Sequence, residues 1–193
     1  MKAVYKLTVA AAIAMLAQAA LGLALRSQYR DVAWIAATWL GNDGVTLVVA
    51  LPLLIAGATY SARGSVRGGL LWLGALAYAL YNYAYYLFGA ALNVFFALYL
   101  TALISAALAL ILALKTISPC EVAREFRGRT PVRLIGGYFV LVGIALASLW
   151  LGIWAAHVFG GRPTPIAPES FKLVATLDIV LMVPALTIGG ALL

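Results

Sequence analysis

The feature that most constrains this chain is a series of six apolar runs separated by short polar segments. Each run is close to the ~20 residues that an α-helix needs to cross the ~30 Å hydrocarbon core of a bilayer. The spans predicted on this basis are residues 7–25, 42–60, 70–88, 93–114, 134–159 and 171–193. No polar stretch between them is long enough for a soluble domain. The sequence therefore predicts a single polytopic transmembrane domain over residues 1–193.

The composition excludes a soluble fold. Hydrophobic residues make up 65% of the 193 residues and charged residues only 10%, whereas a soluble domain carries about 25% charged residues. So few charges cannot cover a surface in water, and lipid is expected to be the outer solvent. The predicted fold class is an all-α, integral membrane six-helix bundle with the lipid bilayer as its partner.

The basic residues indicate the orientation of this bundle. The net charge is +7, and nine of the 13 Lys and Arg residues lie at the amino terminus or after the second and fourth runs. Cytoplasmic loops of membrane proteins are rich in Lys and Arg. We therefore expect cytoplasmic N- and C-termini, a basic cytoplasmic loop at 115–133, and a multi-pass membrane protein. Basic residues in short loops beside apolar runs meet lipid headgroups, so nucleic acid is not expected as a partner.

Polar side chains within the predicted spans gather in the half away from the cytoplasm. An Asp at the centre of a membrane helix costs about 2.5–3.5 kcal/mol on insertion scales, so such groups are expected to face the bundle interior. We predict a polar and aromatic ligand-binding site in the outer half of the bundle. Its candidate residues are Asp178, Asp43, Asn82, Tyr78, Tyr81, Tyr85, Asn93, Trp154 and His157.

Structural explanations compete with this prediction. Asp43 suits the N-cap of a helix, and Asp178 would be equally well explained by a hydrogen bond from a Tyr or Asn of span 70–88. Tyr83 and Tyr86 are predicted to be interfacial anchors, because Tyr is enriched at headgroup level in membrane proteins.

Motifs for catalysis and metal binding do not appear in the sequence. We find no Ser/His nucleophile arrangement, phosphate-binding loop, HExxH or paired-Cys motif. The chain has one cysteine, Cys120, and one histidine, which cannot form a Cys/His zinc site or an intrachain disulfide. No metal is predicted, no cofactor is identified, and the sequence leans against an enzyme.

Three stretches carry a resemblance to known sequences. They are 41–52 with the pattern GND..TL....P, 80–89 with LYNYA.YLFG, and 178–184 with D....VP. Together they resemble a group of uncharacterised small bacterial multi-pass membrane proteins. The resemblance implies a location in the cytoplasmic (inner) membrane of a prokaryote. The resemblance implies that Asp43, Asn82 and Asp178 belong to one recurring site. It also implies that the last helix continues into a basic cytoplasmic segment and further spans.

Three functions are compatible with these features. The first is binding or transport of a small solute or ion, which the polar residues in the outer half of the predicted bundle support. The second is an intramembrane enzyme acting on a lipid-like substrate, with Asp43, Asp178 and His157 as acid/base groups. The third is a non-catalytic assembly or scaffold subunit with a membrane-protein partner, whose polar residues are bonded only to one another.

Overall fold

The computed structural model describes residues 2–128 and 130–193. Every regular element in these residues is helical and none is a strand, which confirms the predicted all-α class. The internal contacts divide the chain into two compact units, Met1–Glu125 and Phe126–Leu193. We call them unit 1 and unit 2.

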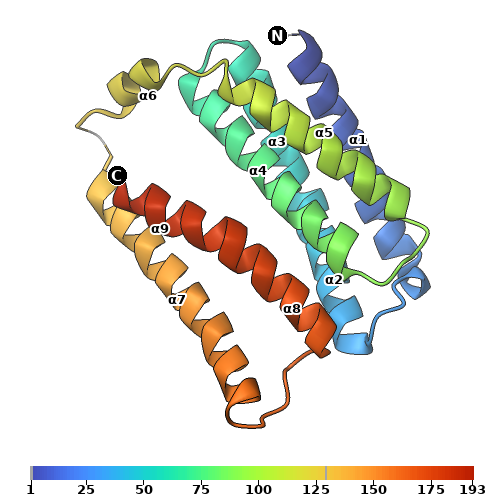
Figure 1. The fold of residues 1–193 in the computed structure, drawn as a ribbon. Helices are drawn as coiled ribbons and strands as arrows, with labels where there is room; N and C mark the ends of the chain where they lie inside the picture. The colour runs from blue at the N-terminus through green and yellow to red at the C-terminus, as the bar shows by residue number, and fades with distance from the viewer. Residues whose placement is uncertain (1, 129) are drawn as a thin grey trace. The chain divides into compact units, whose positions relative to one another are not determined.

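Unit 1 contains four long helices that run alongside one another (Figure 1). They are α1 (Lys2–Ala24), the continuous helix made of α2 (Ala33–Val45), η2 (Thr46–Ala50) and α3 (Leu51–Ala62), then α4 (Val66–Gly89) and α5 (Phe96–Leu114). α4 packs against both α3 and α5, and α1 packs against α5 and α2. A 3-10 turn, η1 (Arg26–Gln28), follows α1, and the short α6 (Pro119–Phe126) follows α5.

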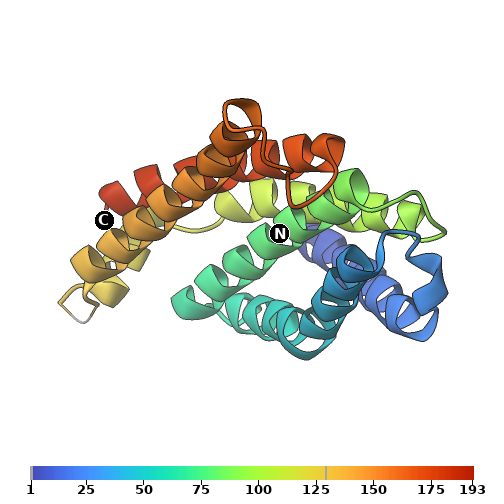
Figure 2. The ribbon, with the colours of Figure 1, turned by 90° about the horizontal axis from the view of Figure 1, so that it is seen from below.

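Unit 2 is a helical hairpin. Its first helix, α7 (Val132–Val158), packs along α9 (Val183–Ala191), which continues α8 (Pro168–Leu177) through η3 (Asp178–Met182). The two views in Figures 1 and 2 show α7 and α9 side by side. A Cβ on Gly190 would lie 2.6 Å from the carbonyl oxygen of Gly136. The two backbones can approach this closely because both positions are glycine.

Two long helices contain a π-helical segment that ends two residues before a proline. η2 precedes Pro52 in α3, and η3 precedes Pro184 in α9. A proline lacks the N–H group, and its ring clashes with the carbonyl four residues earlier, which here belongs to Val48 or Val180. Because each of these residues lies in the π segment, the wider turn accommodates the ring and the helix continues. Such segments are frequent at functional sites.

Five of the described helices are long and apolar enough to cross a membrane. They are Lys2–Ala24, Ala33–Ala62, Phe96–Leu114, Val132–Val158 and Ser170–Ala191. These helices suggest a multi-pass membrane protein. α4 has 24 residues, but its tyrosines and Asn82 make it less apolar, and much of its surface is buried inside unit 1. The sixth span and the cytoplasmic termini stay predictions.

The second long helix begins at Ala33 rather than near Asn42. Packing favours this earlier start, because the Trp39 ring lies against Tyr86 with centroids 4.9 Å apart, and its indole N–H donates to Asp31 at 3.0 Å. Asp43 therefore lies inside a helix, and the N-cap explanation for it is wrong.

Candidate functional site

A closed network of polar side chains surrounds Asp43 in unit 1. Its members are Gln18 on α1, Tyr29 after η1, Asp43 on α2, and Tyr83 and Tyr86 on α4, and we call them the Asp43 cluster. The amide Nε2 of Gln18 donates to Asp43 Oδ1 at 2.9 Å, and the Tyr29 hydroxyl donates to Oδ2 at 2.6 Å. The Tyr86 hydroxyl lies 2.8 Å from Oδ1. Three elements of unit 1 thus supply a partner to one carboxyl group.

The other bonds of the cluster hold these partners in place. Tyr83 donates its hydroxyl proton to Gln18 Oε1 at 2.8 Å, and Gln18 Nε2 also lies 3.0 Å from the Tyr29 hydroxyl. The Tyr86 hydroxyl oxygen has a second neighbour, the backbone carbonyl oxygen of Trp39 at 3.0 Å. Each member of the Asp43 cluster is therefore within hydrogen-bond distance of at least one other member.

Three side chains of the cluster are completely buried. Gln18, Asp43 and Tyr83 are 0% exposed. Among the residues that the structure describes, no Lys, Arg or His lies within ion-pairing distance of Asp43. Burial, together with the hydrogen bond to Asp43, raises the pKa of the Tyr29 hydroxyl above its ordinary value, so Tyr29 stays a donor at physiological pH.

Gly22 makes room for the carboxyl group. A Cβ at this position on α1 would overlap Asp43 Oδ2 and the Tyr29 hydroxyl. Glycine is thus needed here for close approach of side chains rather than for backbone conformation, since Gly22 lies in a regular helix. Any larger residue would push the carboxyl group out of its bonded position.

Loop contacts position the same end of unit 1. Asp31 accepts from the Ala91 backbone N–H at 3.1 Å, which joins the segment before α2 to the turn before α5. Asn93 caps that turn, because its Oδ1 accepts from the Phe95 N–H at 2.9 Å and its Nδ2 donates to Tyr99 at 3.2 Å. Asn93 thus lies before α5 and not in its first turn, and the structure explains it as a turn residue.

Tyr78 and Asn82 lie one turn apart on α4. The Tyr78 hydroxyl is 3.4 Å from Thr46 Oγ1 in η2, and Thr46 is buried. Asn82 is only 6% exposed, and its Nδ2 has no hydrogen-bond partner among the described residues. An unsatisfied buried donor costs about 1–3 kcal/mol. Tyr78 also borders an apolar groove of about 220 Å³ between α3 and α4.

Tyr81 and Tyr85 pair with each other on α4. Their hydroxyl oxygens lie 3.3 Å apart, and their rings meet edge to face with centroids 5.0 Å apart. Both side chains are half-buried. They lie outside the Asp43 cluster.

Asp178 in unit 2 is buried, with 5% of its surface exposed. It is the first residue of η3, and its Oδ2 accepts from the Trp150 indole N–H of α7 at 2.7 Å. A groove of about 490 Å³ in unit 2 is lined by several side chains of α7, among them Trp150, Trp154 and His157. His157 is exposed, with its Nδ1 2.8 Å from the Arg162 carbonyl oxygen.

The predicted site residues belong to both units. Asp43 is joined by Tyr83 and Tyr86, and the prediction that these two tyrosines are interfacial anchors is wrong because both are buried in unit 1. Asp178, Trp154 and His157 belong to unit 2. A single site that includes both acids stays a prediction.

Sequence reasoning missed Gln18, Gly22 and Tyr29 as members of this site. Gln18 gives a usable signal, because it is a lone amide in an otherwise apolar helix and must find partners. Tyr29 gives none, because a tyrosine in a polar loop is common. The role of Gly22 depends on a neighbour 21 positions later in the chain, which sequence spacing does not reveal.

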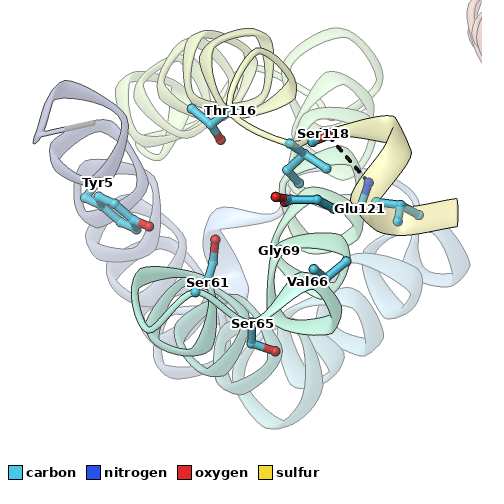
Figure 3. Close-up of a pocket in the computed structure, with 11 residues that line it drawn as sticks. Tyr5, Ser61, Ser65, Val66, Gly69, Thr116, Ser118 and Glu121 are labelled. Carbon is cyan, nitrogen blue, oxygen red and sulfur yellow. Dashed lines mark hydrogen bonds between the residues drawn. The ribbon is translucent and has the colours of Figure 1, made fainter. Parts of the chain in front are cut away.

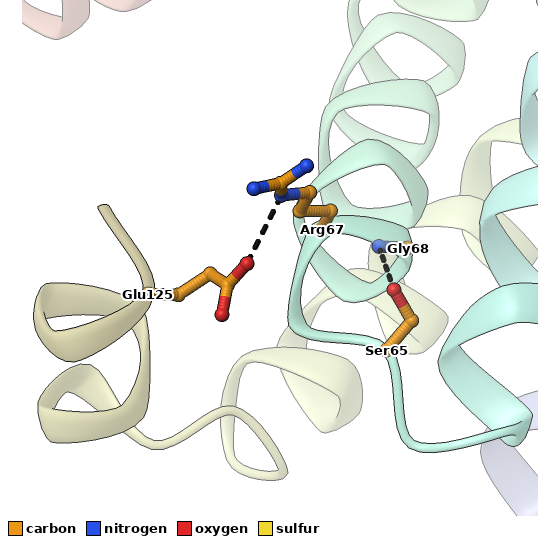
Figure 4. A network of polar contacts seen from close by, with 4 residues as sticks. All are labelled: Ser65, Arg67, Gly68 and Glu125. Carbon is orange, nitrogen blue, oxygen red and sulfur yellow. Dashed lines mark hydrogen bonds and ion pairs between the residues drawn. The ribbon is translucent and has the colours of Figure 1, made fainter. Parts of the chain in front are cut away.

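The other end of unit 1 holds a smaller polar pocket of about 140 Å³ (Figure 3). Tyr5, Ser61 and Ser65, Thr116 and Glu121 line it from α1, the α3–α4 turn, the end of α5, and α6. Beside it, Arg67 Nε pairs with Glu125 at 3.1 Å, and Ser65 caps α4 by accepting from the Gly68 N–H (Figure 4). Within residues 2–128 and 130–193 no group of three or more His, Cys, Asp or Glu is placed to hold a metal ion.

Comparison of the chain with protein-family models, with curated proteins and with solved structures found no match. The site is therefore interpreted from its own geometry.

Proposed function

We propose that this chain is a multi-pass protein of the prokaryotic inner membrane that binds and transports a small ion, with the Asp43 cluster as its ion-binding site. The observation that supports this is a completely buried carboxyl group without a basic partner, among the described residues, on a helix that is long and apolar enough to cross a membrane. Intramembrane acids are expensive, and they commonly mark ion pathways.

The closed geometry favours an ion over a solute. The centre of the cluster is inaccessible, and every polar atom of Asp43 already has a protein partner at 2.6–2.9 Å. A solute with several heavy atoms would have to displace these side chains, whereas a small ion would need only a rearrangement of hydrogen bonds. The π segment η2 follows Asp43 by three residues, and it gives this helix a weak point close to the acid.

The proposed topology has six spans, with α4 as the central polar one. Lys and Arg at the amino terminus and in the loop at 115–133 support cytoplasmic termini, and in this topology the Asp43 cluster lies toward the other face. Labelling of the native thiol of Cys120, which is exposed, tests this. A membrane-impermeant maleimide should label Cys120 in inside-out vesicles and not in right-side-out vesicles, and the reverse pattern would overturn the topology.

Ion flux through reconstituted vesicles tests the function. The purified full chain is placed in liposomes that contain dyes for H⁺, Na⁺ or K⁺, and an ion gradient is imposed. We expect wild type to carry one of these ions at least tenfold faster than empty vesicles, and Asp43→Asn to remove this flux. Glu121→Gln, an exposed acid at the opposite end of unit 1, is the matched control and should keep it. Wild-type flux equal to that of empty vesicles would overturn the proposal.

A scaffold subunit is the second candidate, because the same cluster is filled and satisfied by its own hydrogen bonds. In that case a stoichiometric protein partner should co-purify from native membranes in mild detergent. Asp43→Asn should then weaken the complex through loss of fold, with no ion flux in any variant.

A further inference from the structure

We propose that the ion bound by the Asp43 cluster is a proton, held on Oδ1 of the Asp43 carboxyl group. This inference rests on the proposed ion-transport function and names its ion. It comes from counting the hydrogens available to the oxygen atoms of the cluster.

The Tyr86 hydroxyl has one proton and two oxygen neighbours. Asp43 Oδ1 lies at 2.8 Å and the Trp39 carbonyl oxygen at 3.0 Å. A backbone carbonyl only accepts, and an ionised carboxylate also only accepts. With Asp43 ionised, one of these two short oxygen–oxygen contacts has no proton in it. With a proton on Oδ1, Asp43 donates to Tyr86 and Tyr86 donates to Trp39, so both contacts are hydrogen bonds.

The count uses the Gln18 amide in the direction that the structure gives, with Nε2 2.9 Å from Asp43 Oδ1 and 3.0 Å from the Tyr29 hydroxyl. Turning the amide round would place Oε1, which only accepts, at both of these contacts. One proton on Oδ1 could then not fill the contacts to both Gln18 and Tyr86. The orientation with Nε2 toward Asp43 is therefore the one that fits a protonated carboxyl group.

The energies of the two forms do not decide between them. Hydrogen bonds to a charged group are stronger than neutral ones, so three donors favour the carboxylate. Removing that charge from water is costly without a cation beside it. The groups that face Asp43 are an amide on α1, a phenol after η1 and a phenol on α4. These opposing effects are of similar size, so the proton count carries the argument.

Uptake and release then follow a balanced step. On release, the O–H bond at Oδ1 breaks, the proton passes to water, and the electron pair stays on the carboxylate. The Tyr86 hydroxyl then turns its proton from the Trp39 carbonyl to Oδ1. On uptake the same changes run backward, and no oxidant, reductant or other reactant is required.

Infrared spectroscopy of the full chain in lipid tests the proton directly. A protonated carboxylic acid has a carbonyl-stretch band that shifts down on exchange into D₂O. We expect such a band at neutral pH in wild type and in Glu121→Gln, and its loss in Asp43→Asn. Tyr86→Phe should keep the band and move it to higher frequency, since the acid loses its hydrogen-bond acceptor. Circular dichroism verifies that each variant is folded.

The outcomes separate this inference from the proposed function. Absence of an Asp43 band at every pH at which the chain is folded would overturn the proton, and flux of Na⁺ or K⁺ through the same sample would then leave ion transport standing. A band that disappears in Asp43→Asn, in a chain that carries no ion, would support the bound proton and overturn transport.

Discussion

Asp43 and Asp178 have the same local setting but different surroundings. Each lies at or just before a π segment that ends directly before a proline-containing helix. Asp43 has hydrogen-bond partners on α1, in the segment after η1 and on α4, and Asp178 accepts a hydrogen bond from the Trp150 indole of α7. The local sequence thus places an acid beside a π segment, and side chains from other parts of the chain supply the hydrogen-bond partners.

The two units also differ in which residues they bury. In unit 1 the buried polar groups come from several helices, and α4 supplies the aromatic side chains between them. Unit 2 is a hairpin in which α7 has only Gly136 and Gly143 buried. We expect substitutions at Asp43 to have large effects, because its side chain is 0% exposed and three side chains contact its carboxyl group.

Truncating each acid to alanine, in separate variants, should give the largest difference in the free energy of unfolding. Asp43→Ala leaves three buried polar side chains without their partner, and we expect a loss of about 3–5 kcal/mol in the free energy of unfolding. Asp178→Ala should lose about 1–3 kcal/mol. Unfolding of each variant in mixed micelles with increasing SDS measures both values. Equal losses would break the comparison between the two acids.

Substitution of Gly22 tests the close packing around Asp43. Gly22→Ala places a methyl group against Asp43 Oδ2, so we expect a loss of about 1–3 kcal/mol from overpacking. Gly44→Ala is the control on the neighbouring helix, because its Cβ would meet no described atom within 4 Å. It should be neutral or stabilise by up to ~1 kcal/mol through helix propensity. A neutral Gly22→Ala would show that the cluster is loosely packed.

Removal of the indole donor tests the Asp178 side of the comparison. Trp150→Phe keeps a ring next to Phe171, whose centroid lies 5.6 Å away, but it deletes the N–H that reaches Asp178. We expect a loss of about 1–2 kcal/mol. Trp154→Phe, at a position 46% exposed, should change stability by less than ~0.5 kcal/mol. Thermal unfolding of both variants side by side gives the contrast.

Removal of an exposed ion pair should give the smallest loss in the free energy of unfolding among these polar contacts. Arg67 and Glu125 keep 63% and 39% of their side-chain surfaces exposed. Glu125→Gln should therefore cost about 0–1 kcal/mol, and added salt should reduce that cost further. A loss as large as that of Trp150→Phe would mean that burial does not set the scale of these effects. Repeating the unfolding measurement at low and high salt tests this.

Much of the helical framework was predictable from apolar run length. The runs that begin near 70, 134 and 171 correspond to α4, α7 and α8–α9 within a few residues. The early start of α2 was not predictable, because it depends on Trp39 packing against Tyr86 from a distant part of the chain. The buried positions of Tyr83 and Tyr86 were missed for the same reason, since a tyrosine near a helix end is equally typical of the headgroup region.

By itself, the sequence determined that this protein is helical, that its helices suit lipid, and that Asp43, Asn82 and Asp178 are costly residues in apolar surroundings. These properties follow from composition and period, which act within each helix. Only the tertiary structure decided that Gln18 and Tyr29 bond to Asp43 and that Gly22 leaves space for it. Hydrogen bonds and close packing depend on atoms that are brought together when helices pack. The sequence around each residue does not indicate which distant residues it will contact.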